Sequence, residues 1–210
     1  MTFEILEEDE HLIAIHKPPG ILVHRTPISE DTVFVLQLLR NQIRQRIYPV
    51  HRLDRGTSGV LVFAKNRESA GLLAQHFQNQ TVRKWYWAVI RGYVEDAGTI
   101  DYPIAPDKGK PLQSAITHYR KISQTECPFA IGRYPTARYS FVEIRPETGR
   151  FHQIRRHFAH LRHPVINDKR HGDVKHNKFF RDQLRLSRLL LHAVRLTIPH
   201  PVENRLLTLE

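Results

Sequence analysis

The 210-residue chain contains a single cysteine, Cys127. One cysteine can form neither an internal disulfide nor a cysteine-based zinc site, and this favours a reducing compartment such as the cytoplasm. The chain also lacks the run of roughly 18 apolar residues that a membrane-spanning helix needs. Its first residues show no basic segment followed by an apolar stretch, as a signal peptide would. Internal repeats, low-complexity tracts and linkers are absent from the sequence as well. We therefore expect a cytoplasmic protein that does not insert into a membrane.

Positive charge, in contrast, is abundant. The chain has 32 Lys and Arg against 21 Asp and Glu, which gives a formal net charge of +11. The charge is uneven, because residues 4–10 are rich in acidic side chains whereas residues 145–188 are dense in Arg and Lys. An excess of this size favours a polyanionic partner such as a nucleic acid, and its asymmetry predicts one binding face.

Hydrophobic periodicity predicts strands joined by short turns, together with a few helices. The predicted strands are 12–16, 60–64, 82–91, 115–121, 139–145 and 189–198, and the predicted helices are 31–46, 66–77 and the second half of 149–161. The hydrophobic content of 40% is ordinary for a globular protein, and a chain of this length can bury a substantial core. The pattern predicts an α+β fold with a largely antiparallel central sheet, flanking helices and loops.

The most informative segment is residues 51–60, which read His-Arg-Leu-Asp-Arg-Gly-Thr-Ser-Gly-Val. Asp54 stands between Arg52 and Arg55, and a turn rich in Gly, Thr and Ser leads into the apolar strand. A carboxylate between two arginines should stay ionised, which suits a nucleophile or a base better than an acid. The local pattern alone also fits a structural ion pair, because such pairs perturb pKa values too.

A second informative segment, residues 148–157, places several donors and cations close together. Such a segment suits phosphate contact or pairing with a carboxylate. Four histidines lie in it or soon after it: His152, His157, His160 and His163. They raise the possibility of a metal site, but acidic and cysteine ligands are missing nearby, and Arg155 and Arg156 would repel a cation. The histidines are better explained by a basic helix that faces RNA.

Residues 51–59, followed by a strand that ends in Ala64-Lys65, closely resemble the signature of the RluA-type pseudouridine synthases. The resemblance implies that Asp54 is the catalytic residue. Residues 149–157 resemble the third motif of the family, whose arginine pairs with the catalytic aspartate, and this role falls on Arg155. The segments 17–24, 84–88 and 190–193 resemble three further motifs. The five motifs follow one another in the family's order, from about residue 12 to 198.

The resemblance implies the pseudouridine-synthase fold with a central active-site cleft. It assigns Tyr86 to stacking on the target base, although Tyr86 could also be an ordinary sheet residue. It assigns Arg52 to replacing the extruded nucleotide in the RNA stack, although Arg52 could simply bind a phosphate. Leu190 and Leu191 are predicted to line the pocket. The other residues predicted to contact RNA are Arg55, Arg133, Arg138, Arg150, His152, Gln153 and Arg156.

The implied activity is the isomerisation of uridine to pseudouridine, in which the base leaves C1′ of the ribose, turns and rejoins through C5. Flipping a uracil out of an RNA stack costs a few kcal/mol, of which stacking on Tyr86 recovers roughly 1–3 kcal/mol. Asp54, ionised beside Arg155, is then the only group needed for covalent or general-base chemistry. The sequence leaves open whether it attacks C1′, adds to C6 or removes the 2′-proton. Because no redox change or group donor is involved, we expect neither a cofactor nor a metal.

Only about ten residues precede the first predicted strand, so we expect residues 1–210 to form a single catalytic domain without the N-terminal S4 domain of many relatives. The segments 117–120, 132–136 and 156–164 resemble the branch that modifies uridine 65 of tRNA, in the stem of the TψC arm. We therefore predict a tRNA substrate and a monomeric enzyme. The alternatives are a synthase for 23S rRNA or another tRNA position, a non-catalytic basic RNA-binding protein, and a histidine-based metallohydrolase. The chain ends sooner after its last predicted strand than relatives usually do. We therefore expect the C-terminal cap of the fold to differ from that of relatives, but not the catalytic centre.

Overall fold

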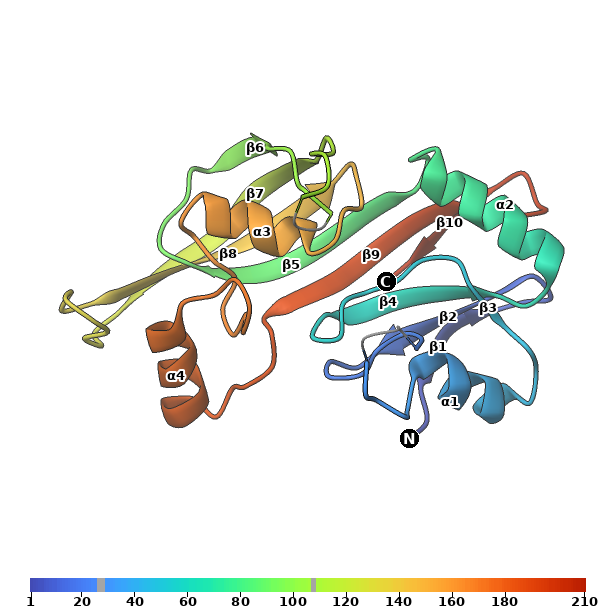
Figure 1. The fold of residues 1–210 in the computed structure, drawn as a ribbon, viewed down its shortest axis with the longest axis horizontal. Helices are drawn as coiled ribbons and strands as arrows, with labels where there is room; N and C mark the ends of the chain where they lie inside the picture. The colour runs from blue at the N-terminus through green and yellow to red at the C-terminus, as the bar shows by residue number, and fades with distance from the viewer. Residues whose placement is uncertain (26–28, 107–108) are drawn as a thin grey trace. The chain divides into compact units, whose positions relative to one another are not determined.

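The computed structural model describes residues 1–25, 29–106 and 109–210. The described residues form ten strands and four helices, and the chain divides into two compact units (Figure 1). Unit 1 comprises Met1–Lys84 and Ala193–Glu210, and unit 2 comprises Trp85–His192. The boundaries fall inside two strands, β5 (Arg83–Arg91) and β9 (Leu191–Pro199). All the strand pairs described below are antiparallel, which confirms the predicted fold class.

Unit 1 is built around two buried neighbouring strands. Its strands are β1 (Glu4–Glu8), β2 (Leu12–Lys17), β3 (Tyr48–Pro49), β4 (Ser58–Ala64), β10 (Leu206–Leu209) and the larger part of β9. β2 pairs with β4 in a register that sets Leu12 opposite Ala64 and Lys17 opposite Gly59. Every residue of β4 is buried. Because successive side chains of a strand point to opposite faces, both faces of β4 are covered.

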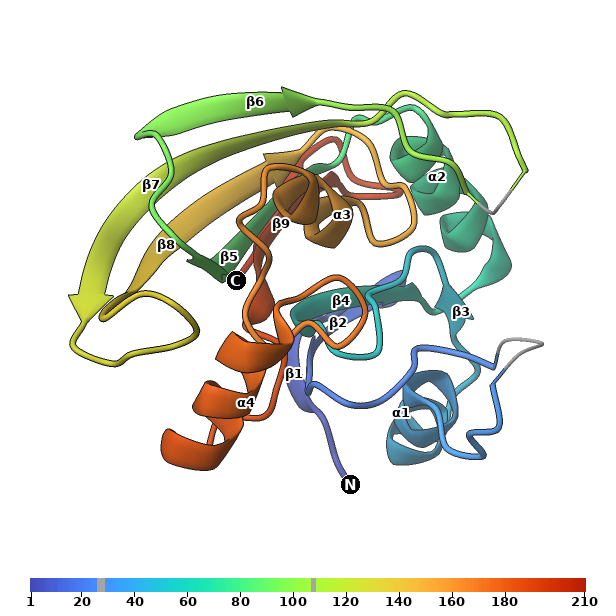
Figure 2. The same cartoon turned by 60° about the vertical axis from the view of Figure 1, so that its left-hand side comes forward.

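Helices α1 (Val35–Ile43) and α2 (Arg67–Gln78) lie on opposite sides of β2 and β4 (Figures 1 and 2). The predicted helix 66–77 corresponds to α2, and Asn66 is its N-cap, since the side chain of Asn66 accepts the backbone N–H of Ser69 at 2.8 Å. α1 is shorter than the predicted helix 31–46, because it ends where Arg44 takes a left-handed conformation with φ 54°.

Gly59 allows β9 to approach β4 closely. Its φ of +115° is one that residues with a side chain rarely adopt, and a Cβ at this position would lie 2.7 Å from the backbone nitrogen and carbonyl carbon of Ala193. Real Cβ atoms do not come so near to a backbone atom. Gly59 is the second residue of β4, which directly follows the loop that carries Asp54.

We expect Gly59→Ala to lower the free energy of unfolding by about 2 kcal/mol or more, because backbone strain and overpacking add at this position. Gly71→Ala is the matched control. Gly71 lies on the exposed side of α2, and a methyl group added there would meet nothing within 4 Å, so alanine should stabilise the helix by about 0.5–1 kcal/mol. Urea unfolding of both variants measures the difference. Equal stabilities would show that the close approach of β9 is not constrained by Gly59.

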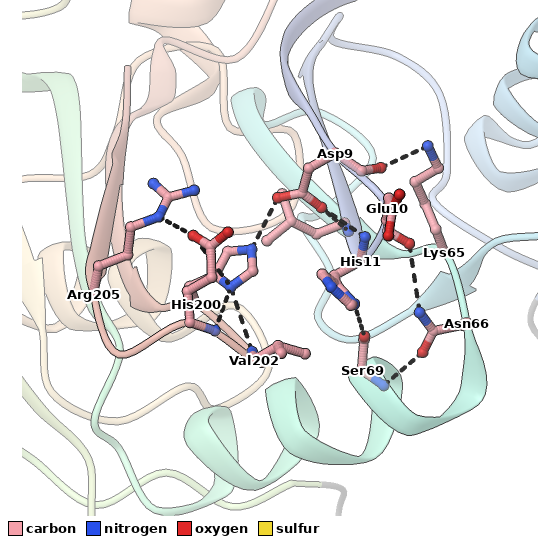
Figure 3. A network of polar contacts seen from close by, with 11 residues as sticks. Asp9, Glu10, His11, Lys65, Asn66, Ser69, His200, Val202 and Arg205 are labelled. Atoms are coloured by element: carbon pink, nitrogen blue, oxygen red, sulfur yellow. Dashed lines mark hydrogen bonds and ion pairs between the residues drawn. The ribbon is translucent and has the colours of Figure 1, made fainter.

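A polar network joins the beginning and the end of unit 1 (Figure 3). The buried ring of His200 accepts the backbone N–H of Glu203 at Nδ1 (2.9 Å), so its Nε2 carries the proton that is donated to Asp9 (2.9 Å). Asp9 also accepts the backbone N–H groups of His11 and Leu12. Burial opposes ionisation of Asp9, but these hydrogen bonds outweigh burial and lower its pKa. The network ties the segment after β9 to the turn before β2.

Unit 2 contains a second set of antiparallel strands. It includes β6 (Ala97–Asp101), β7 (Ile116–Cys127) and β8 (Ala137–Pro146). From the edge of the sheet inward, β6 pairs with β7, β7 pairs with β8, and β8 pairs with β5. Helix α3 (Gln153–His160) lies within the curve of these strands (Figure 2). Its Phe158 is fully buried in a cluster that includes Val142 and Ile144 of β8. A further helix, α4 (Val174–Gln183), buries only Phe180.

Several elements differ from the sequence-based predictions. β7 continues to Cys127, well beyond the predicted end at residue 121. The sequence did not predict this extension, because the outer half of the strand is mostly exposed and so lacks apolar alternation. β8 begins at Ala137, two residues before the predicted strand 139–145, and so includes Arg138. No sequence pattern predicted β1, β3, β6, β10 or α4, which are short or largely polar. None of the described helices is long and apolar enough to cross a membrane.

Candidate active site

Asp54 lies in unit 1, in the loop between β3 and β4, and is half-buried. Its carbonyl oxygen accepts the backbone N–H of Thr57 at 3.1 Å, which closes a turn. Leu53 before it and Thr57 after it are buried, with 5% and 2% exposure. The loop is therefore anchored on both sides of Asp54, while the aspartate itself remains partly accessible to solvent.

The ammonium group of Lys17 supports this loop from inside the unit. Lys17 is fully buried. Its Nζ donates to the carbonyl oxygens of Pro18 (3.0 Å), Arg55 (3.2 Å) and Thr57 (2.8 Å). An ammonium group has three donors, and all three are used here. The backbone N–H of Gly20 also donates to the Arg55 carbonyl at 2.7 Å. Lys17 therefore fixes the backbone on the C-terminal side of Asp54.

Lys17 is also an electrostatic neighbour of Asp54. Burial lowers the pKa of Lys17 to about 8, and the negative charge of Asp54 acts in the opposite direction. In the sequence, Lys17 stands only as part of a motif, without a role of its own. Its contacts with residues 38 and 40 positions away explain why no local pattern revealed this role.

His51 fixes the N-terminal side of the loop. Its Nε2 accepts the backbone N–H of Val62 in β4 at 3.0 Å, and its ring stacks on Phe77 of α2 with centroids 4.5 Å apart. A ring nitrogen that accepts a backbone N–H carries no proton, so His51 is neutral. Burial lowers its pKa to about 3, and the positive charge of Lys84 acts in the same direction. His51 therefore positions the Asp54 loop and does not transfer protons.

Acidification should destabilise the fold through His51. Between pH 6.5 and 3 the unfolded chain binds a proton at this histidine and the folded chain does not, so stability is lost as the pH falls. We expect a loss of about 2 kcal/mol between pH 6.5 and 5. His51→Gln keeps an acceptor for the Val62 N–H but does not titrate, so it should flatten this dependence. Urea unfolding at both pH values tests this, and an unchanged slope in the variant would contradict it.

The two arginines beside Asp54 are exposed. Arg55 forms an ion pair with Asp31. Burial lowers the pKa of His24, and the charge of Arg52 adds to this effect, so Arg52 and His24 are near neighbours. The Nδ1 atom of His24 is buried without a hydrogen-bond partner among the described residues. Arg52 thus stands at the exposed edge of the loop, as a residue that contacts RNA would.

The loop before α3 in unit 2 is organised by Gln153. Its Oε1 accepts from the Thr148 hydroxyl (2.7 Å) and from the backbone N–H of Arg150 (2.9 Å). Its Nε2 donates to the Ile116 carbonyl and to the Thr117 hydroxyl, at 3.0 Å each. These two accepted and two donated hydrogen bonds use the full hydrogen-bonding capacity of a side-chain amide. Gln153 therefore holds this loop against β7, and its predicted contact with RNA stays a prediction.

Arg155 forms a bidentate ion pair with Asp168 inside unit 2. Its Nε and Nη2 atoms lie 2.7 Å from Oδ2 and Oδ1 of Asp168. The side chain of Arg155 is 10% exposed and that of Asp168 is 0% exposed. Burial opposes ionisation of Asp168, but hydrogen bonds from Arg155 and from backbone N–H groups outweigh it and lower the pKa. No sequence pattern indicated Asp168. Asp54 belongs to unit 1, and its pairing with Arg155 stays a prediction.

Three other residues predicted to bind RNA, Arg150, His152 and Arg156, lie close to Arg155 in the sequence. Arg150 donates to the carbonyl of Ser114 (3.1 Å) and Arg156 to that of Ala105 (2.7 Å). His152 takes a left-handed conformation with φ 54°, and its Nδ1 lies 3.0 Å from Nε2 of His171. All three are half-buried, and their contact with RNA stays a prediction.

The residues predicted to form the uracil pocket lie in β5 and at the start of β9. Tyr86 is half-buried and packs against the core cluster around Ile144. Leu191 is 3% exposed and belongs to the same cluster, whereas Leu190 packs against a separate cluster that contains Phe180. Leu191 therefore has a core function, whichever residues contact the base.

Arg133, in the connection between β7 and β8, and Arg138, in β8, differ in their surroundings. Arg133 is exposed, lies over the ring of Tyr134 at 4.9 Å and donates to its hydroxyl at 2.7 Å. Arg138 forms an ion pair with Glu126 (3.3 Å) and lies over the ring of Tyr93 at 5.3 Å. The charge of Arg138 is thus partly balanced within the protein, and Arg133 is the better placed of the two for a phosphate.

The histidines do not form a shared site. His157 is fully buried, with Nδ1 3.0 Å from the Thr117 hydroxyl and Nε2 3.0 Å from the Tyr102 carbonyl. It joins α3 to its neighbours, and whether this helix faces RNA stays a prediction. His163 Nδ1 lies 2.8 Å from the Arg91 carbonyl. Within the described residues, no group of three or more His, Cys, Asp or Glu side chains is placed to hold a metal ion.

Comparison with known proteins identifies the class. Residues 11–160 match the family model described as RNA pseudouridylate synthase. Two solved human structures share the fold. RNA Pseudouridylate Synthase Domain Containing 1 has a TM-score of 0.79 at 24% identity, over 98% of this chain and 82% of that one. Domain Containing 4 has a TM-score of 0.73 at 24% identity, over 98% and 87%. The chain belongs to the RNA pseudouridylate synthase family, whose members are isomerases, and the predicted family, fold and enzyme class are confirmed.

More similar relatives are named tRNA pseudouridine synthase C. The chain is 49% identical to the one from Pectobacterium carotovorum subsp. carotovorum over 99% of its own length, and spans 58% of that relative. It is 48% identical to the one from Yersinia pestis, over 98% of this chain and 84% of the relative. For Vibrio parahaemolyticus serotype O3:K6 the identity is 44%, over 100% and 90%.

Proposed function

We propose that the protein converts uridine 65 of tRNA, in the stem of the TψC arm, to pseudouridine. The observation that carries this proposal is the similarity of 44–49% identity, over nearly the whole chain, to relatives named tRNA pseudouridine synthase C. The net charge of +11 supports an RNA substrate. The segments 117–120, 132–136 and 156–164 add the resemblance to the branch that modifies position 65.

Asp54 is the proposed catalytic residue. It is half-buried, and the loop that carries it is held by Lys17 on one side and by His51 on the other. A reacting group held in one geometry accelerates a reaction, because the entropy of orienting it is lost on folding and not in the transition state. An aspartate in such a loop can serve as a nucleophile or base toward a uridine that enters from solvent.

The target base must leave the RNA helix before Asp54 can reach it. We assign Arg52, exposed at the edge of the loop, to the space that the flipped nucleotide vacates in the stack. Tyr86 supplies a half-buried aromatic ring for the base, and such stacking contributes roughly 1–3 kcal/mol. Arg155 supplies a fixed positive charge for the Asp54 carboxylate. The reaction moves a glycosidic bond within one nucleotide, so it consumes no second substrate.

Mapping of the product tests the proposed position. An unmodified tRNA transcript with uridine at position 65 is incubated with the enzyme, and pseudouridine is then located by chemical modification and primer extension. We expect one new stop, at position 65, and none in a matched transcript that has cytidine at that position and guanosine opposite it. Modification of 23S rRNA or of another tRNA position instead would contradict the proposal. A protein that binds tRNA without modifying it would support a non-catalytic RNA-binding function.

A further inference from the structure

We propose that α4 and the turn between β7 and β8 form a basic surface of unit 2 that binds the phosphate backbone of tRNA. Its principal residues are Arg133, Lys175 and Lys178, and the term basic surface refers to these three. The inference rests on the proposed function, because it takes tRNA as the ligand. It extends that function to α4, which lies outside every segment that carries the resemblance to the family.

The segment that contains α4 has a large excess of positive charge. Residues 169–188 include seven Lys and Arg and only two Asp. Both aspartates are already paired, Asp173 with Arg91 and Asp182 with Arg181. The other six cations are exposed, and within the described residues they form no ion pair: Lys169, Arg170, Lys175, Lys178, Arg185 and Arg188. Exposed charge of one sign that the protein does not balance attracts a polyanion.

The packing of α4 leaves its charged side open to solvent. Phe180 is the only buried residue of the helix. Lys175 and Lys178 are three positions apart and therefore lie on the same side of the helix. With 3.6 residues per turn, Phe180 points about 200° away from Lys178. The two lysines thus lie on the side of α4 that faces away from the core of unit 2.

The turn between β7 and β8 lies next to Lys175. Ile131 and Tyr134 form an antiparallel bridge, so Gly132 and Arg133 are the two residues of a tight turn. A Cβ at Gly132 would lie 3.8 Å from Cδ and 3.9 Å from Nζ of Lys175. In both views this connection lies beside α4 (Figures 1 and 2). The ammonium group of Lys175 is therefore close to the residue that precedes Arg133, and the cations of the two elements belong to one surface.

Aromatic contacts hold the two elements together beneath the charges. Phe129, just before the turn, contacts Phe179 of α4 with ring centroids 4.9 Å apart. Ile131 and Phe179 both pack against the core cluster that contains Tyr139 and Phe180. These contacts fix α4 against the end of the β7–β8 hairpin. The cations are thus presented in a set arrangement, and less conformational freedom is lost when a ligand binds.

The guanidinium group of Arg133 is oriented before any ligand binds. It lies over the ring of Tyr134 at 4.9 Å, and its Nη2 donates to the Tyr134 hydroxyl at 2.7 Å. A guanidinium group has five N–H donors, and this hydrogen bond uses one. The remaining donors can bind a phosphate in the bidentate manner that arginine favours.

The surface has the character expected for RNA and not for a lipid bilayer. A helix that lies in a membrane interface has a broad apolar face besides its cations. In α4 the rings of Phe179 and Phe180 pack within unit 2, and Val174 is the only exposed apolar residue of the helix. Cations without an apolar face bind nucleic acid through its phosphates and release counterions.

The test is the salt dependence of tRNA binding. The Kd of the full chain for an unmodified tRNA transcript is measured between 50 and 200 mM salt, for wild type and for Lys175→Gln/Lys178→Gln. Each phosphate contact contributes about 0.9 to the slope of log affinity against log salt. The double variant should therefore bind more weakly at 50 mM salt, with a slope that is smaller by about 2. Addition of Arg133→Gln should reduce the slope by about 1 more.

Two further variants separate contact with RNA from loss of charge or of fold. Lys175→Arg/Lys178→Arg keeps the charges and should keep the wild-type slope. Arg40→Gln/Arg67→Gln removes the same charge from exposed positions of α1 and α2. Because these helices lie on opposite sides of β2 and β4, they do not form one surface, and the slope should stay close to that of wild type. Exposed substitutions of this kind change stability by about 0.5 kcal/mol or less, so all variants should fold.

A wild-type slope in Lys175→Gln/Lys178→Gln would overturn the inference, as would an equal reduction in Arg40→Gln/Arg67→Gln. Binding of wild type to anionic phospholipid vesicles that the two lysine substitutions abolish, with an unchanged slope for tRNA, would assign the surface to lipid and also overturn it. If wild type forms no pseudouridine in tRNA but its slope depends on the two lysines, the proposed function fails and the surface remains. An active wild type whose slope does not depend on them refutes the inference alone.

Discussion

Asp54→Asn is expected to lower the rate of pseudouridine formation in tRNA by at least about 10⁴-fold, the scale of loss when a reacting group is removed from an enzyme. An amide cannot act as the nucleophile or base that the reaction needs. Asparagine has nearly the same size, and Asp54 is half-buried in a loop whose backbone bonds come from Lys17 and Gly20. The fold and the affinity for tRNA should therefore remain. The fraction of uridine 65 converted over time measures the rate.

Asp96→Asn provides the matched control for this variant. Its carboxylate is 95% exposed and forms an ion pair with Lys121, at 2.9 Å, within unit 2. Exposed ion pairs of this kind contribute about 0–1 kcal/mol, so stability and turnover should both stay near the wild-type values. Retention of more than a small fraction of wild-type turnover by Asp54→Asn, in protein free of the wild type, would show that another group carries out the reaction.

Lys17→Met is expected to lower kcat about 10²-fold and the free energy of unfolding by about 3 kcal/mol. Methionine fills most of the lysine's space but donates no hydrogen bond. The carbonyls of Arg55 and Thr57 then lose their shared donor, and the Asp54 loop loses its fixed backbone. Steady-state kinetics and urea unfolding at pH 7 measure the two losses separately.

Lys65→Met is the control for Lys17→Met. Lys65 also donates to a backbone carbonyl, that of Asp9 at 2.7 Å (Figure 3). It donates to the side chain of Glu8 as well, at 2.8 Å. It should lose some stability and keep wild-type kcat, because it does not contact the Asp54 loop in the described structure. Equal losses of kcat in the two variants would mean that Lys17 contributes only to folding. Wild-type kcat in Lys17→Met would remove its role at the site.

Lys17 should also make the free energy of unfolding depend on pH in a defined direction. Its folded pKa of about 8 lies below the ordinary value of 10.5. Between these values the unfolded chain binds the proton more tightly, so this residue makes the fold more stable as the pH rises. Burial also lowers the pKa of Lys84 to about 8, so Lys84 contributes a similar gain in both proteins. The rise in stability between pH 8 and 9.5 should therefore be smaller in Lys17→Met than in wild type. The same rise in both proteins would assign it to another group.

Local sequence patterns were sufficient for the elements that have a clear period or a local cap. The apolar run 60–64 became the fully buried β4, and Asn66 became the N-cap of α2. Both depend on residues close together in sequence. α4 was missed because it buries one residue, Phe180, and so shows no apolar stripe. The outer half of β7 was missed because it is exposed.

The sequence predicted Asp54 as the candidate catalytic residue, but it did not predict the side chains that support its loop. The motif located the loop, but its support comes from Lys17, about 40 residues earlier in the chain. His51 stands in the same motif as Asp54, yet its Nε2 is occupied by a backbone N–H of β4. Asp168 lies 13 residues from Arg155, and only the loop that follows α3 brings them together. The residue type limits the chemistry that is available to a side chain. The contacts made in the folded protein determine which part of that chemistry is used.

The most direct test of the central claim, that the Asp54 carboxylate acts on a uridine of tRNA, uses tRNA labelled with tritium at C5 of uracil. Rejoining the base through C5 must release this hydrogen to water. Wild type should release the tritium of one uridine per tRNA, and Asp54→Asn, folded and bound to the same tRNA, should release none. Release by the variant at the wild-type rate, or no release by wild type from any tRNA, would contradict the account.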